Sequence, residues 1–92
     1  MGIREAIAKI EAMPVIATVP VPGLGDVRVK RLKAAEAEHL KDAYDLISAT
    51  ILNDDDTIAF PTPADVKKCD VATVKAMLDA YYRVNSVRED RL

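Results

Sequence analysis

The first residues of the chain carry apolar side chains at the spacing of a helix. These apolar positions are Ile3, Ala6, Ile7 and Ile10. Side chains three, four and seven positions apart share one face of a helix. Pro14 ends the pattern, because proline has no backbone N–H and its ring clashes with the preceding turn. The sequence therefore predicts an amphipathic helix over residues 1–13.

After Pro14 the pattern changes to β-branched residues two positions apart, which is typical of strands. It runs from residue 15 to residue 21 and returns at residues 27 and 29. Between the two runs, Pro22 and Gly23 suit the central positions of a type II turn, since Pro presets φ and Gly accepts a positive φ. The sequence therefore predicts a β-hairpin over residues 15–32.

A symmetric loop over residues 22–26 would fix the register of this hairpin. The expected pairs are Val21 with Val27, Val19 with Val29, and Ala17 with Arg31. In that register the four valines share one face, and the other face carries Thr18, Arg28 and Lys30. Pro20 cannot donate a ladder hydrogen bond, so the first strand is expected at an edge of the sheet.

The longest helical pattern covers residues 34–52. Its apolar positions are Leu40, Ala43, Tyr44, Ile47 and Ile51. Its opposite side carries Glu36, Glu38, Lys41, Asp42 and Asp45. Such a two-sided pattern predicts one long amphipathic helix. The acidic segment Asn53–Thr57 ends it, and residues 58–60 are expected to form a short extended stretch.

Residues 62–85 predict two more helices. Thr62 offers an N-cap hydroxyl, Pro63 suits the first helical position, and Asp65 stands where a capping box places its carboxylate. Asp70 can cap the last helix. The apolar stripe of that helix comprises Val71, Val74, Met77, Leu78 and Tyr81.

These elements predict a single small domain over residues 1–92. Its fold class is expected to be mainly α (α+β), with an N-terminal β-hairpin packed with three to four helices. Residues 86–92 show no period and are expected to form a loose tail. A chain of 92 residues has a modest core, and with one Phe and no Trp that core should be aliphatic.

Charge and hydropathy exclude several classes of protein. Thirteen Lys and Arg against fifteen Asp and Glu give a net charge of −2, which provides no general attraction for nucleic acid or an anionic membrane. No apolar run approaches the roughly 20 residues of a membrane-spanning helix, and the first residues lack the apolar centre of a signal peptide. The chain is therefore expected to be soluble and cytoplasmic.

Few residues could support catalysis or bind a metal. His39 is the only histidine, so no second imidazole can join it in a metal site or a proton relay. Cys69 is the only cysteine and would need a base beside it to act as a nucleophile. An EF-hand loop starting at Asp54 would need Gly at its sixth position, where Ala59 stands. We therefore expect no catalytic, cofactor-binding or metal-binding residues and no enzymatic activity.

Several segments, taken in order, resemble the phage tail assembly chaperone family. They are Val21-Pro22-Gly23-Leu24-Gly25-Asp26-Val27-Arg28-Val29, Leu52-Asn53-Asp54-Asp55-Asp56, Phe60-Pro61-Thr62-Pro63-Ala64-Asp65-Val66 and Arg83-Val84-Asn85. Each segment alone is ordinary turn or cap chemistry, and the resemblance rests on their order and spacing over about residues 15 to 86. The sequence departs from the pattern of the family at Lys33 and Ala34, where a hydroxyl cap is common, and at Thr57 and Ser86, where Gly is usual.

The resemblance implies a non-enzymatic protein of a long-tailed phage or prophage. Such a protein binds the tape measure protein in the host cytoplasm, keeps it soluble, helps to recruit tail tube protein, and is not retained in the mature virion. Self-association of the chaperone is also expected. On this interpretation the apolar face of the hairpin and the rim of the last helix contact the partner. The predicted partner-binding residues are Val19, Val21, Val27, Val29 and Tyr82.

Two other interpretations remain open at this stage. A structural head-tail connector or tail-completion subunit of a phage would also be small, acidic and oligomeric, and it would persist in the finished particle. A small DNA-binding regulator would need a basic recognition helix, whereas the basic residues of this chain are spread out and every predicted helix carries acidic ones.

Overall fold

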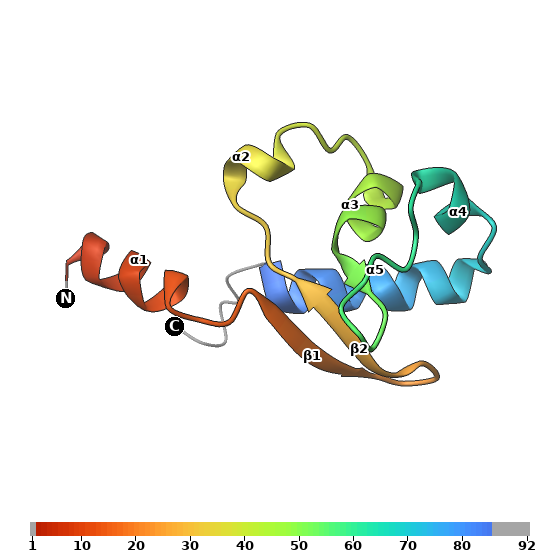
Figure 1. The fold of residues 1–92 in the computed structure, drawn as a ribbon, viewed down its shortest axis with the longest axis horizontal. Helices are drawn as coiled ribbons and strands as arrows, with labels where there is room; N and C mark the ends of the chain where they lie inside the picture. The colour runs from red at the N-terminus through yellow and green to blue at the C-terminus, as the bar shows by residue number, and fades with distance from the viewer. Residues whose placement is uncertain (1, 86–92) are drawn as a thin grey trace.

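Five helices and a three-stranded antiparallel sheet make up the computed structural model, which describes residues 2–85 (Figure 1). In chain order the elements are α1 (Ile3–Glu11), β1 (Ile16–Val21), β2 (Gly25–Lys30), α2 (Ala34–Ala37), α3 (Ala43–Thr50), β3 (Ile51–Leu52), α4 (Pro63–Lys67) and α5 (Val71–Asn85). The predicted α+β class is confirmed. The predicted tail over residues 86–92 lies outside the described residues.

The hairpin of β1 and β2 forms with a tighter loop than the sequence pattern predicts. Val19 pairs with Val27 and Val21 pairs with Gly25, so the loop contains only residues 22–24. The predicted pairing of Val21 with Val27 and of Val19 with Val29 is therefore wrong by two residues. Because the shift is even, the same side chains still share a face.

Two glycines explain the short loop. The amide of Leu24 donates to the carbonyl of Val21 at 3.0 Å, and Gly23 has a φ of +88°, as the expected type II turn requires. Gly25 has a φ of +77° and begins β2 directly after the turn. A left-handed residue at this position lets the chain enter the second strand without two further loop residues.

The predicted long helix over residues 34–52 is wrong, since the structure divides it into α2, a turn, α3 and β3. Local hydrogen bonds account for the break. Asp42 accepts a hydrogen bond from the amide of Asp45 and caps α3, while the carboxylate of Asp45 accepts one from the amide of Lys41. The residues on the polar side of the predicted helix therefore cap a new helix.

The end of this segment becomes the third strand of the sheet. Ile51 pairs with Val29 and Leu52 pairs with Arg28, which places β2 in the centre of the sheet. The acidic segment then turns the chain back, so that Ile58 forms a bridge with Leu52. The prediction of a short extended stretch at residues 58–60 is borne out only by this single bridge residue.

The two helices predicted over residues 62–85 are confirmed as α4 and α5. At the start of α4, the amide of Thr62 donates to the carboxylate of Asp65 at 3.2 Å, as in the expected capping box. At the end of α5, the side chain of Asn85 accepts a hydrogen bond from the amide of Leu32 at 2.7 Å and donates one to the carbonyl of Lys30 at 3.2 Å. Asn85 therefore fastens the last helix to the residues that follow β2.

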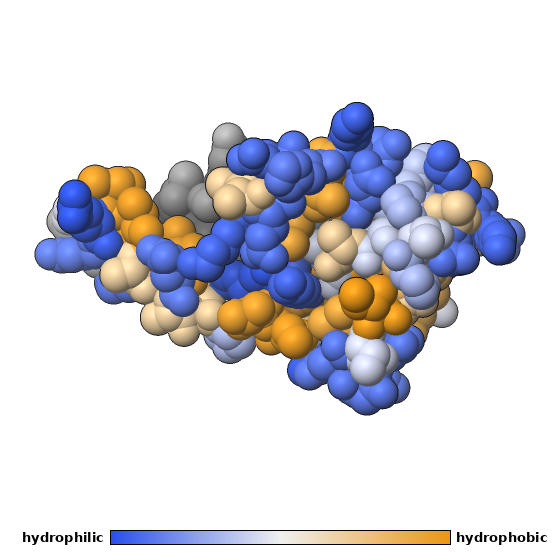
Figure 2. Space-filling model, turned by 45° about the horizontal axis from the view of Figure 1, so that its top comes forward, coloured by the Kyte–Doolittle hydropathy of each residue, from blue (hydrophilic) through white to orange (hydrophobic). Residues whose placement is uncertain are grey.

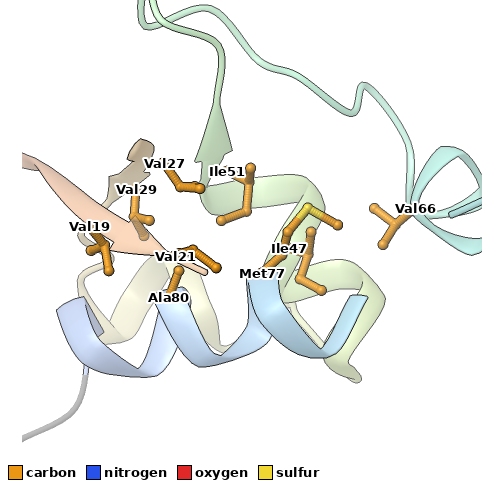
Figure 3. Close-up of a cluster of buried hydrophobic side chains, with 9 residues drawn as sticks. All are labelled: Val19, Val21, Val27, Val29, Ile47, Ile51, Val66, Met77 and Ala80. Atoms are coloured by element: carbon orange, nitrogen blue, oxygen red, sulfur yellow. The ribbon is translucent and has the colours of Figure 1, made fainter. Parts of the chain in front are cut away.

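The hydrophobic core lies between the sheet and the helices (Figure 3). α5 packs across β1 and β2, and α3 packs against α4 and α5. The buried hydrophobic cluster consists of Val19, Val21, Val27, Val29, Ile47, Ile51, Val66, Met77 and Ala80. It contains no aromatic residue, in agreement with the expected aliphatic core. Phe60 and Tyr44 pack at its margin.

Helix α1 extends away from this body (Figure 1). It was predicted over residues 1–13 and is observed over Ile3–Glu11, and none of its residues is buried. Among the described elements, none packs extensively against it. Within residues 2–85, the amphipathic helix that the sequence predicts therefore has no element packed extensively on its apolar face.

Candidate protein-binding surface

The structure places four of the five predicted partner-binding residues in the core. Val19, Val21, Val27 and Val29 are at most 9% exposed, because α5 covers the face of the hairpin on which they lie (Figure 3). A partner cannot contact these side chains in the folded chain, so their assignment as contact residues is wrong. Tyr82, the fifth, is 48% exposed and its ring meets that of Tyr81 edge-on at 5.1 Å.

The structure brings a different group of apolar side chains to the surface. Their exposed fractions are 75% for Ile3, 44% for Ile7, 44% for Ile10, 46% for Met13 and 62% for Val15. Figure 2 shows hydrophobic surface at the end of the molecule formed by α1. We name these five residues the N-terminal apolar surface. Single exposed apolar side chains are common in proteins, but several of them gathered together favour an interaction surface.

A groove runs beside this surface, between α1 and the chain that follows β2. It has a volume of about 500 Å³. It is lined by Ile7, Ile10, Glu11, Met13, Val15, Arg31, Leu32, Lys33, Ala34 and Glu36. Its lining thus combines apolar side chains with charged side chains of both signs. A concave apolar site with a few polar groups is the usual form of a binding groove.

A backbone hydrogen bond and a weak ionic contact join the two sides of the groove. The amide of Arg31 donates to the carbonyl of Val15 at 2.6 Å. Lys33 Nζ lies 3.8 Å from the carboxylate of Glu11, and both side chains are more than half exposed. An exposed pair of this kind contributes little to stability. On the other side, the amide of Lys33 donates to the carboxylate of Glu36, which lowers the pKa of Glu36 together with the nearby Lys30 ammonium.

The acidic turn after β3 uses its carboxylates to hold its own conformation. Asp56 accepts two hydrogen bonds from Arg28, at 2.7 and 2.9 Å, and this contact lowers the pKa of Asp56. The hydroxyl and amide of Thr57 donate to Asp55, which lowers the pKa of that carboxylate as well. Within residues 2–85, no three His, Cys, Asp or Glu side chains gather in a way that could hold a metal ion.

The two residues considered for catalysis lie in different environments. His39 is exposed in the turn between α2 and α3, whereas Cys69 is partly buried against the core. No hydrogen bond connects them in the part of the chain that the structure describes. Of the helices formed by residues 2–85, none has the length and the apolar character needed to cross a membrane.

The apolar stripe of α1 is visible in the sequence, but its exposure is not. Periodicity shows which side chains share a face and cannot show what covers that face. Comparison with family models, with curated proteins and with solved structures gives no match for this chain. The N-terminal apolar surface and its groove are therefore identified from the geometry of this chain alone.

Proposed function

We propose that this protein is a tail assembly chaperone of a long-tailed phage or prophage. In this role it binds the tape measure protein in the host cytoplasm, keeps it soluble, helps to recruit tail tube subunits, and leaves before the virion is complete. The ordered resemblance over residues 15 to 86 supports this choice of family. The observation that supports a protein-binding role is the uncovered N-terminal apolar surface beside its groove.

The spacing of the apolar side chains on α1 suits packing against a helical client. Two helices pack through apolar side chains at spacings of three, four and seven along each helix. Ile3, Ile7 and Ile10 present this spacing on α1. A tape measure protein is, in this family, a long helical rod with apolar seams, and many copies of a small binder could cover these seams.

The modest size of the surface also fits a temporary role. Nine helical residues and one groove offer much less than the roughly 2,000 Å² typical of an obligate interface. Weak contacts repeated along a rod can still give strong overall binding through multivalency. Each copy can then be displaced when a tail tube subunit arrives.

Co-expression with the tape measure protein tests the proposal. We expect the soluble fraction of the tape measure protein to rise several-fold with the native chain and to fall back with Ile7→Asp. Val71→Asp is the matched control, because Val71 is 70% exposed on the first turn of α5, far from α1 in the fold, and a carboxylate is favourable at a helix N-terminus. Equal solubilisation by the native chain and by Ile7→Asp would contradict the proposed contact surface.

Purified virions provide a second test. A chaperone should be absent from mature particles, whereas a head-tail connector or a tail-completion subunit should remain in them. Detection of the chain at a fixed number of copies per particle would overturn the chaperone proposal in favour of a structural subunit.

A further inference from the structure

Helix α1 exposes an apolar face of the kind that packs against a second helix. Its three isoleucines are all at least 44% exposed, and none of its nine residues is buried. Transfer of such side chains from water to an apolar partner is favourable, because it removes apolar area from water. An amphipathic helix of this length is also marginal unless its apolar face is covered. Packing of these isoleucines against a partner of complementary shape would therefore stabilise α1.

The position of the groove indicates which end of a partner helix would contact it. The C-terminal half of α1, with Ile7 and Ile10, lines the groove together with Leu32. Ile3, the most exposed isoleucine, lies at the opposite end of the helix and outside the groove. If a second α1 runs antiparallel to the first, its Ile3 meets Ile10 at the groove of the first chain, and by symmetry the same contact forms at the other end.

The charged residues of α1 are placed as an antiparallel pair of α1 helices would require. Arg4 and Glu11 are seven positions apart, so they lie on the same flank of the helix beside the apolar stripe. In a two-fold antiparallel helix pair, the same flank of each helix faces its counterpart on the other copy, and the two helices run in opposite directions. Arg4 of one copy then lies opposite Glu11 of the other, twice per dimer.

From these observations we infer that this chain forms a homodimer in which the α1 helices of two copies pack antiparallel through Ile3, Ile7 and Ile10. Each α1 inserts its N-terminal half over the groove of the other copy. This inference goes beyond the proposed function and does not depend on it, because it concerns the purified chain without any client. It also predicts that a helical client must compete with the second copy for the same stripe.

The dimer is expected to be weak. Each copy contributes one helix of nine residues and one groove, and we expect them to bury less than the roughly 1,200 Å² of a typical stable interface. We therefore expect a dissociation constant on the order of 100 µM. Such a dimer would protect the stripe at high concentration and release it to a competing client.

Sedimentation equilibrium of the full chain, from about 5 µM to about 500 µM, measures the dimer directly. The native chain should shift from one to two chains per particle over this range. Ile7→Asp should remain monomeric throughout, and Val71→Asp should behave like the native chain. Circular dichroism will establish that each variant is folded, which is expected because α1 contributes no buried side chain.

A charge exchange tests the antiparallel direction. Arg4→Glu and Glu11→Arg, each alone, should weaken self-association about three- to tenfold, since each places like charges in contact twice. An equimolar mixture of the two variants should recover the native affinity, because every pair across the interface then has opposite charges. In a parallel dimer these two flanks do not meet, and the mixture would not recover.

Three outcomes would overturn the inference. They are a native chain that stays monomeric at 500 µM, a dimer that survives Ile7→Asp, and a mixture of charge variants that associates no better than each variant alone. None of these results depends on the tape measure protein, so failure of the dimer and failure of the proposed function can be told apart.

Discussion

Arg28 on β2 holds Asp56 in the acidic turn through two hydrogen bonds, from Nε at 2.7 Å and from Nη2 at 2.9 Å. Asp56 has a φ of +68°, a conformation that costs energy for most side chains. The same guanidinium group also donates to Thr18 on β1 at 2.9 Å. One arginine thus connects the edge strand, the central strand and the turn that follows β3.

This contact predicts a pH dependence of stability. Arg28 lowers the pKa of Asp56 below its ordinary value of 3.8, so the carboxylate stabilises the folded chain above that pH. The stabilisation is lost as the pH falls through the lowered pKa. Asp56→Asn, which tolerates the positive φ but carries no charge, should therefore lose less stability on acidification below about pH 4 than the native chain.

Thermal unfolding at several pH values will measure this difference. Asp55 and Glu36 also have lowered pKa values and remain in the variant, so part of the acid sensitivity should persist. Asp54→Asn is the matched control, since Asp54 is a neighbouring carboxylate without a hydrogen bond to Arg28 among the described contacts. Identical acid profiles for the native chain and Asp56→Asn would contradict the prediction.

The second prediction concerns Asn85. Its side chain bonds the amide of Leu32 and the carbonyl of Lys30, and both contacts are partly buried. Asn85→Ala leaves these backbone groups without their partner and should lower the free energy of unfolding by about 1–3 kcal/mol. Lys75→Ala, on an exposed position of the same helix, should change it by less than about 0.5 kcal/mol. Urea denaturation of both variants distinguishes the two effects.

The third prediction tests the tight hairpin loop. Gly25→Ala should destabilise the chain by about 1–2 kcal/mol, because the methyl group is unfavourable at a φ of +77° even though space is available. Gly2→Ala is the control, since Gly2 is equally unobstructed and has a φ of −77°. If Gly25→Ala were as stable as Gly2→Ala, the loop would not close as the structure has it.

The fourth prediction separates core valines from surface valines. Val29 is 0% exposed, and Val29→Ala should cost about 2 kcal/mol of unfolding free energy through lost burial and the cavity left behind. Val15 is 62% exposed, and Val15→Ala should leave stability within about 0.5 kcal/mol of the native value. Chemical denaturation measures both values, and equal costs at the two sites would be inconsistent with the observed packing.

Elements with local signals could be predicted from the amino-acid sequence alone. The helical spacing of Ile3, Ile7 and Ile10, the Pro-Gly turn and the capping pair of Thr62 and Asp65 each act over a few residues, and each is found in the structure as predicted. The α+β class and the aliphatic core follow from the same patterns together with composition. Local backbone preferences and side-chain period are sufficient for these features.

Other features depended on a local cap that competes with the apolar spacing, or on contacts between distant segments. Apolar spacing over residues 34–52 is compatible with one helix, but Asp42 can also cap a new helix, and pairing with β2 draws Ile51 and Leu52 into the sheet. The sequence shows that the valines of the hairpin share a face, whereas only the tertiary structure shows that α5 covers it.

Tertiary packing also explains why the predicted contact residues of the hairpin are buried and the exposed apolar surface lies on α1. Hydrophobicity identifies the side chains that need cover, and the path of the chain decides which of them receive it. In this fold the valines of the hairpin are buried in the core, whereas the isoleucines of α1 are exposed beside a groove. The surface available to a partner therefore depends on tertiary packing.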